Sequence, residues 1–94
     1  MMEFNKTVTV INKLGIHARP SAMLVQIAIN YKADLFVRKA EDDESEEVNA
    51  KSIMGVMMLA AGYKTKLKFR AIGDDAENLL NEVDNLFKSK FNEE

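Results

Sequence analysis

The chain has 94 residues, of which 47% are hydrophobic and 30% charged, and its formal net charge is -2. This length and balance predict one small domain, residues 1–94, with a core of its own, and they exclude a disordered chain. The absence of cysteine excludes disulfides, thiolate metal sites and redox chemistry, and the lack of a long apolar run or a signal-peptide pattern predicts a cytoplasmic protein with no membrane insertion.

The charges are distributed unevenly along the chain. Residues 41–47 hold six of the fifteen acids, and residues 74–94 hold seven. The stretches 1–40 and 48–73 together carry eleven of the thirteen basic residues. A basic body of this kind favours a partner with an acidic surface or a ligand that bears phosphate.

The first two predicted elements are a strand and a helix. Residues 4–12 are rich in β-branched side chains and alternate in polarity, which predicts a strand with one buried face. Apolar residues then recur at helical spacing from Ala18 to Tyr31. Pro20 fits only the first turn of a helix, where its missing N–H is harmless, so the helix should begin within a residue or two of His17.

Two short strands and an uncharged helix are predicted next. The strands cover residues 34–39 and, across an acidic loop, 46–50. The helix covers residues 52–62, between Ser52 as an N-cap and Gly62 as a C-terminal glycine, with no charged residue between them. A two-layer domain of this size can bury only one side of so short a helix, so we interpret it as a docking surface, with a fully buried helix as the alternative. We expect some of four apolar side chains to remain exposed, namely Ile53, Met54, Met57 and Met58.

The last strand and helix have the clearest patterns. Residues 64–72 alternate Lys66, Lys68 and Arg70 with apolar residues, as does a strand with one face in water. A helix should start at Asp74, which with Glu77 has the spacing of a capping box. Its expected apolar stripe consists of Ala76, Leu79, Leu80, Val83, Leu86, Phe87 and Phe91. The order of elements predicts an α+β fold, with helices on one face of an antiparallel sheet.

His17 is the only histidine, and its predicted place at the start of a helix favours binding of a phosphate group. The first turn of a helix favours anions, and the guanidinium of Arg19 in the same turn suits phosphate oxygens. A neutral imidazole can attack phosphorus, so this site is predicted to become a phosphohistidine, with a surface or packing histidine as the alternative. The chain has no nucleotide-binding loop, no metal-spaced acids and no second histidine, so we expect no cofactor and no metal. The phosphoryl group must then come from another protein.

Other chemistries find less support in the sequence. The acidic residues 41–47 lack the spacing of a calcium loop and are interpreted as a solvated connection. Ser21 and Ser45 lack the surroundings of a catalytic nucleophile, and Ser21 is expected to support the first helical turn. The basic row of the last strand lacks the aromatic residues of an RNA-binding sheet, so we expect no nucleic acid partner.

Two stretches, "GIHARPSAMLVQIA" and "VNAKSIMGVMMLAAG", resemble the phosphohistidine and regulatory-serine motifs of HPr. HPr is the phosphocarrier family of the bacterial phosphoenolpyruvate-dependent sugar phosphotransferase system. The resemblance covers nearly the whole chain and implies an open-faced sandwich of four antiparallel strands under three helices (βαββαβα). It also implies that His17 accepts a phosphoryl group on Nδ1 from enzyme I and passes it to enzyme IIA domains, with Arg19 as the active-site arginine. We expect a monomer.

The resemblance further places Ser52 where many family members are phosphorylated by HPr kinase/phosphorylase, a role compatible with an N-cap. The surface expected to bind the partners comprises Ala18, Ala22, Ile53, Met54 and Met57. A regulatory or nitrogen-branch relative that acts mainly by docking is the alternative function. The chain departs from the family pattern in a longer, more acidic segment between the second and third strands and in Lys64, which stands where the family usually has glycine.

Overall fold

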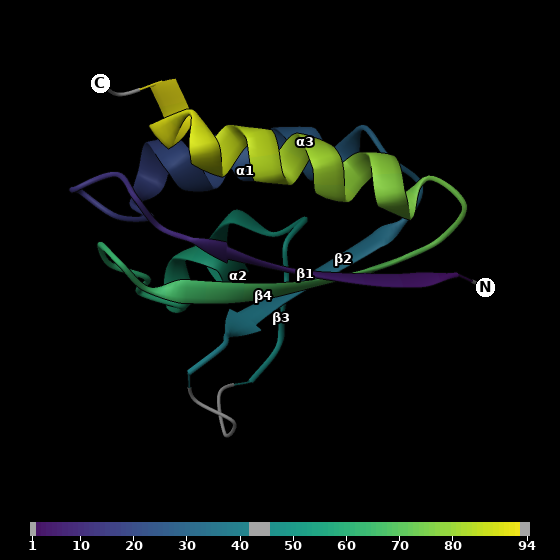
Figure 1. Ribbon diagram of the computed structural model, residues 1–94, viewed down its shortest axis with the longest axis horizontal. Coiled ribbons are helices and arrows are strands. Elements are labelled where there is room, and N and C mark those ends of the chain that lie inside the picture. Colours follow the sequence, from purple (N-terminus) through teal and green to yellow (C-terminus); the bar gives the residue numbers. More distant parts are fainter. Residues whose placement is uncertain (1, 42–45, 93–94) are drawn as a thin grey trace.

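Four strands form a single antiparallel sheet in the order β1-β4-β2-β3 in the computed structural model, which describes residues 2–41 and 46–92 (Figure 1). The strands are β1 (Glu3–Thr9), β2 (Asp34–Lys39), β3 (Val48–Asn49) and β4 (Lys66–Ile72). The helices are α1 (Ala18–Ile29), α2 (Ile53–Met58) and α3 (Ala76–Lys88), followed by a 3-10 turn, η1 (Lys90–Asn92).

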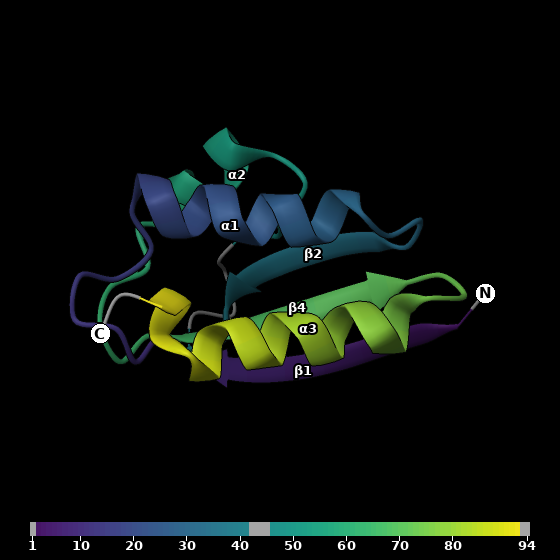
Figure 2. The same cartoon turned by 90° about the horizontal axis from the view of Figure 1, so that it is seen from above.

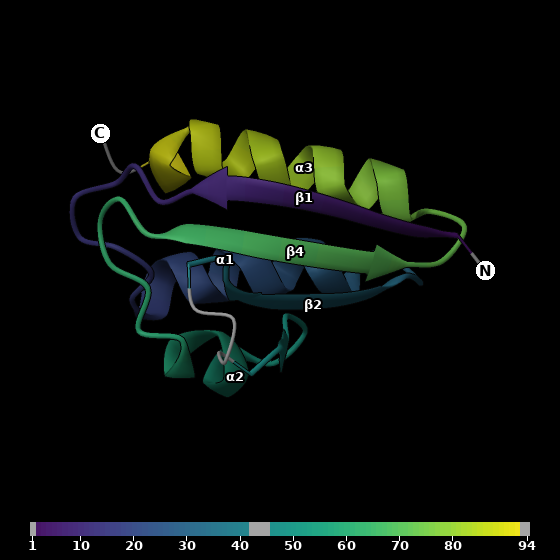
Figure 3. The same ribbon diagram turned by 60° about the horizontal axis from the view of Figure 1, so that its bottom comes forward.

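The helices lie on one side of the sheet and leave the other side open. Figure 2 shows α1 and α3 side by side over the strands, with α2 next to α1, and Figure 3 shows the sheet from its uncovered side. Alternate residues of β4 explain this arrangement, because Leu67, Phe69 and Ala71 are buried while Lys66 and Lys68 are exposed. The predicted α+β open-faced sandwich is therefore confirmed.

Aromatic contacts join the sheet to α3. The rings of Phe69 and Phe87 meet edge to face with centroids 5.7 Å apart, and Phe87 meets Phe91 in the same way at 4.8 Å. The whole predicted stripe of the last helix is buried, which confirms the periodicity argument. Its members are Ala76, Leu79, Leu80, Val83, Leu86, Phe87 and Phe91, the last of which lies in η1.

The predicted capping box at the start of α3 is wrong. Asp75, not Asp74, is the N-cap, and its side chain makes no capping hydrogen bond to the helix. Its carboxylate oxygens instead accept hydrogen bonds from the backbone N–H groups of Lys32 and Ala33, both at 2.9 Å. These bonds hold the pKa of Asp75 below its ordinary value. The carboxylate thus ties α3 to the loop after α1, and sequence spacing alone gives no sign of such a tertiary contact.

The middle of the chain is less regular than predicted. β3 contains only Val48–Asn49, and of the acidic segment 41–47 the residues 42–45 lie outside the described part of the chain. The helix expected over 52–62 ends at Met58, and the chain then turns at Ala60, whose φ is 49°. Gly62 therefore does not end the helix. The early exit lets the following segment reach the loop that precedes α1.

Lys64 adopts a backbone conformation that glycine adopts more easily. Its φ is 74°, in the left-handed region, and its N–H donates to the carbonyl oxygen of Val10 at 2.7 Å. A lysine thus occupies a left-handed position in the turn into β4.

Candidate functional site

His17 is the N-cap residue of α1, as its distance from Pro20 predicts. Its backbone is extended, with φ −95° and ψ −162°, and its side chain is half-exposed and makes no capping hydrogen bond. The first helical hydrogen bond runs from the N–H of Ser21 to the carbonyl oxygen of His17, at 3.0 Å. The imidazole is therefore displayed at the helix start without being used to cap it.

A tight turn fixes the position of His17. The side-chain amide of Asn12 donates to the carbonyl oxygen of Gly15 at 2.8 Å, and the N–H of Gly15 donates back to the carbonyl oxygen of Asn12 at 3.1 Å. Gly15 has a φ of 74°, and a Cβ added there would lie only 2.7 Å from the carbonyl oxygen of Ala61. The N–H of Ile16 donates to that same oxygen at 2.8 Å. The segment before His17 is thus fastened to the segment after α2.

The first turn of α1 offers donors for an anion. The N–H groups of Ala18 and Arg19 precede the first intrahelical donor, and both residues are exposed. Pro20 has no N–H and is buried, so it supports the turn without adding a donor. The hydroxyl of Ser21 is buried with no hydrogen-bond partner in the described part of the chain, so the backbone of Ser21, not its hydroxyl, supports this turn.

The uncharged helix α2 displays its side chains to solvent. Of its residues only Val56 is buried, together with Leu59 just after its end. Exposed fractions are 44% for Ile53, 73% for Met54, 42% for Met57 and 79% for Met58. The prediction of exposed apolar side chains is confirmed, and the fully buried alternative is wrong. Two alanines of α1 were also predicted to bind partners, and of these Ala18 is exposed and Ala22 half-buried.

Two further exposed apolar residues escaped the sequence analysis. Leu14 is 75% exposed and Tyr63 is 50% exposed. Leu14 precedes Gly15 and Tyr63 follows Gly62, and at these two glycines the segment before His17 meets the segment after α2. Both residues lie in connections, where helical or strand periodicity gives no signal. They extend the exposed side chains of α2 toward the turn that carries His17. We call this set the apolar surface, and it comprises Leu14, Ile53, Met54, Met57, Met58 and Tyr63.

Ser52 caps α2 as predicted. Its Oγ accepts a hydrogen bond from the N–H of Gly55 at 3.1 Å, and the residue is exposed. The neighbouring Lys51 donates from Nζ to the carbonyl oxygen of Tyr31, at 2.9 Å, and so fastens the start of α2 to the end of α1. Ser52 therefore stands next to a cation, at the edge of the apolar surface.

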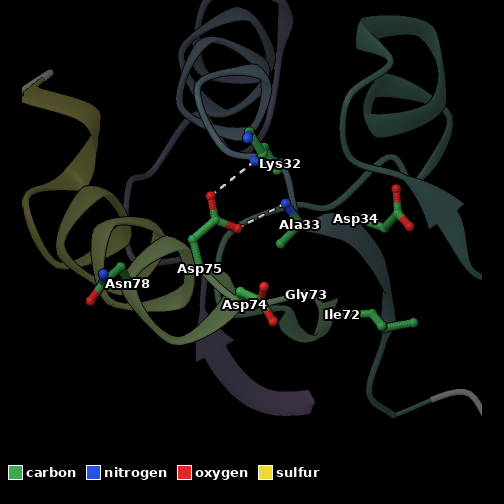
Figure 4. Close-up of a pocket in the computed structure, with 8 residues that line it drawn as sticks. All are labelled: Lys32, Ala33, Asp34, Ile72, Gly73, Asp74, Asp75 and Asn78. Atoms are coloured by element: carbon green, nitrogen blue, oxygen red, sulfur yellow. Dashed lines mark hydrogen bonds between the residues drawn. The ribbon is translucent and has the colours of Figure 1, made fainter. Parts of the chain in front are cut away.

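An open pocket of ≈ 610 Å³ lies at the other end of α1 from His17 (Figure 4). Three carboxylates line it, those of Asp34, Asp74 and Asp75, and both oxygens of Asp75 are hydrogen-bonded to the loop after α1. Such a lining repels phosphate. Within the described residues no group of three or more His, Cys, Asp or Glu side chains is placed to hold a metal ion, and no helix could cross a membrane. His17 itself is half-exposed, and Ala18 and Arg19 beside it are exposed.

Comparison with known proteins agrees with this fold. A family model described as the phosphorylation site of the HPr component of the phosphotransferase system matches residues 4–89. The chain is 42% identical over 94 residues to the phosphocarrier protein HPr of Xylella fastidiosa (strain Temecula1), with 100% of this chain and 99% of that protein covered. It is also 33% identical over 93 residues to the phosphocarrier protein NPr of Escherichia coli K12, covering 99% of this chain and 100% of that protein. A crystal structure of HPr from Thermoanaerobacter tengcongensis superimposes with a TM-score of 0.84 at 39% identity, covering 100% of this chain and 99% of the other.

Proposed function

The chain belongs to the HPr family of phosphocarrier proteins of the phosphotransferase system, and we propose from this premise that His17 is the residue that carries the phosphoryl group. The observation that supports this most strongly is a half-exposed imidazole at the N-cap of α1 that takes no part in capping the helix. In the charging step, Nδ1 of the neutral ring attacks phosphorus, the new N–P bond forms, and the bond from phosphorus to the donor breaks. In the discharging step an acceptor group attacks the same phosphorus, and the neutral imidazole is restored.

The first turn of α1 supplies the charge balance for the carried group. A phosphoryl group brings about −1.5 to −2 charge near neutral pH, by analogy with other phosphorylated residues. The N–H groups of Ala18 and Arg19 and the positive end of the helix dipole favour that charge, and the guanidinium of Arg19 can pair with the oxygens. Because these groups are exposed, water and the acceptor protein can replace them, so the phosphoryl group is stabilised without being trapped.

We propose that enzyme I is the donor, that enzyme IIA domains are the acceptors, and that both contact the apolar surface while they reach His17. The two features are linked, since the turn before His17 is hydrogen-bonded to the segment after α2. Methionine side chains adapt to different partners, which suits a carrier that must bind a donor and several acceptors in turn. We propose that the chain docks through this surface as a monomer, and sedimentation of the purified chain tests that expectation.

The sugar branch is the preferred assignment, and a nitrogen-branch role is the second candidate. The likeness to NPr of Escherichia coli is the specific observation behind the second candidate. The phosphorylated protein should pass its phosphoryl group to a sugar-specific enzyme IIA faster than to the nitrogen-branch counterpart. The reverse order of rates would assign the chain to the nitrogen branch.

We propose that Ser52 is a site of regulatory phosphorylation by HPr kinase/phosphorylase. A phosphate on this exposed hydroxyl would place charge beside Met54 and Ile53, which partners must cover. Ser52→Asp keeps a capping oxygen and adds charge, so it should fold normally and slow transfer from enzyme I, whereas the uncharged Ser52→Asn should not. Equal transfer rates for the two variants would remove this explanation of inhibition.

The carrier function is tested by incubating the folded chain with phosphoenolpyruvate and enzyme I. The wild type should gain one acid-labile phosphoryl group, and His17→Ala should gain none while keeping its circular dichroism spectrum. Arg19→Ala is a graded test, because it should still be labelled, at a reduced rate. A folded wild type that stays unlabelled, or a His17→Ala variant that is labelled, would show that the proposal is wrong.

A further inference from the structure

The helix α2 is rich in sulfur. The chain has six methionines and no cysteine, so thioether groups hold all of its side-chain sulfur. Three of these methionines, Met54, Met57 and Met58, lie on α2, which packs beside α1 at the edge of the helical layer (Figure 2). The lack of cysteine thus excludes the oxidation of thiols, whereas methionine can still be oxidised to its sulfoxide.

The methionines differ in how far an oxidant can reach them. Met54 and Met58 are 73% and 79% exposed, whereas Met57 is 42% exposed. Met54 and Met58 stand four residues apart, so they are neighbours on one face of the helix. Met23 of α1 is half-buried and packs against the core. Because a peroxide must contact the sulfur atom, it should oxidise Met54 and Met58 before Met57 and Met23.

Oxidation of these two side chains should leave the fold intact. Methionine sulfoxide is polar and disrupts a core when the methionine is buried. The helix α2 is held to the core by the buried side chains of Val56 and Leu59, while Met54 and Met58 keep most of their surface in solvent. The new oxygen atoms would therefore remain hydrated in the free protein.

The same oxygen atoms would change the apolar surface for a partner. A protein that covers Met54 and Met58 would have to bury them, and burying a polar group that finds no hydrogen bond is unfavourable. We propose that Met54 and Met58 form a reversible oxidation site, at which a hydroperoxide weakens docking of the phosphoryl donor and so slows transfer to His17. This inference rests on the proposed docking of enzyme I at the apolar surface.

Each oxidation transfers one oxygen atom to sulfur. The sulfur lone pair attacks the outer oxygen of the hydroperoxide, the S–O bond forms, the O–O bond breaks, and water or an alcohol leaves with the proton. The sulfur loses two electrons and the peroxide gains them. A methionine sulfoxide reductase reverses the change with a dithiol, which supplies two electrons and two protons, becomes a disulfide and releases the oxygen as water.

The test treats the folded chain with a limiting amount of hydrogen peroxide, removes the peroxide with catalase, and then measures phosphoryl transfer from enzyme I. Mass spectrometry of peptides should find added oxygen on Met54 and Met58 before Met57 and Met23. The transfer rate should fall about tenfold. The Tm should change by less than about 4 °C. Sulfoxide reductases for both sulfoxide epimers, with dithiothreitol, should restore the rate.

Met2 supplies a matched control. It is 58% exposed, and its carbonyl oxygen accepts a hydrogen bond from the N–H of Gly73, which lines the pocket at the far end of α1 from His17. Met2→Leu should therefore lose as much rate on oxidation as the wild type. A double variant with Met54→Leu and Met58→Leu, whatever its own rate, should lose less than about twofold under the same treatment.

Several results would overturn the proposal. They are an oxidised chain that transfers at the untreated rate, a double variant that loses as much rate as the wild type, oxygen found first on Met57 or Met23, and unfolding that accounts for the lost rate. An untreated, folded chain that accepts no phosphoryl group would contradict the proposed carrier function, and the inference with it.

Discussion

His17 occupies a capping position that a smaller polar residue would fill better. N-cap residues with short oxygen-bearing side chains accept a hydrogen bond from the first turn, and the imidazole of His17 makes no such bond. The backbone at His17 is already extended, as a capping residue requires. His17→Ser should therefore create a cap on α1 that His17→Ala lacks.

The expected gain can be worked out from the geometry. A serine cap is worth about 1 kcal/mol over alanine. For a chain of 94 residues this corresponds to a Tm higher by about 4–8 °C for His17→Ser than for His17→Ala. Thermal unfolding followed by circular dichroism measures the difference, and neither variant should accept a phosphoryl group. The result would show that this position supports a side-chain cap, which His17 does not supply.

Ser52 provides the internal standard for this experiment. Its Oγ makes the capping bond to Gly55, so Ser52→Ala should lower the Tm by a similar amount. If Ser52→Ala loses stability as expected while the two His17 variants melt at the same temperature, the reasoning about the start of α1 is refuted. A His17→Ser variant less stable than His17→Ala would refute it more strongly.

Three further changes test other parts of the account. Met54→Asp should slow phosphoryl transfer from enzyme I at least about tenfold and change the unfolding free energy by less than about 0.5 kcal/mol. Ile29→Asp, which changes another exposed apolar residue at the far end of α1, should leave the transfer rate unchanged. Equal effects of the two variants on the transfer rate would show that the apolar surface is not a specific docking site. In urea unfolding, Lys64→Gly should stabilise the chain by up to about 1 kcal/mol, because φ is 74° at this position. Lys66→Gly, in a regular strand, should destabilise the chain by about the same amount. A loss of stability in both variants would show that the backbone at Lys64 is not strained. Because the pKa of Asp75 is lowered in the folded protein, its carboxylate contributes fully to stability above its ordinary pKa of 3.8, and this contribution is lost as the pH falls below that value. The difference in unfolding free energy between wild type and Asp75→Asn should therefore shrink on acidification. A difference that stays constant with pH would contradict the assigned hydrogen bonds.

The elements that repeat regularly could be predicted from the sequence. β4 and α3 each bury one face, so apolar residues recur along the sequence at the period of a strand or of a helix. The start of α1 could also be predicted, because the ring of Pro20 is compatible only with the first turn. These features depend on residues that are close together in the sequence, so they can be predicted from it.

The features that the sequence did not reveal depend on contacts between distant segments. The carboxylate of Asp75 turns away from its own helix because two backbone N–H groups after α1 lie within reach. α2 ends early, and the segment beyond it meets the turn at Gly15. Leu14 and Tyr63 join the apolar surface through that same contact. No periodicity marks such residues, so only the folded chain shows that they belong to the site.

The central claim is that a nitrogen of His17 carries the phosphoryl group. Because the chain has a single histidine, phosphorus–nitrogen NMR on protein with isotope-labelled histidine reports on that ring alone. After incubation with phosphoenolpyruvate and enzyme I, the account predicts a phosphorus resonance coupled to Nδ1 that disappears when an enzyme IIA domain is added. A folded protein whose ring nitrogens show no bond to phosphorus, or a phosphoryl group that stays in place in the presence of the acceptor, would contradict it.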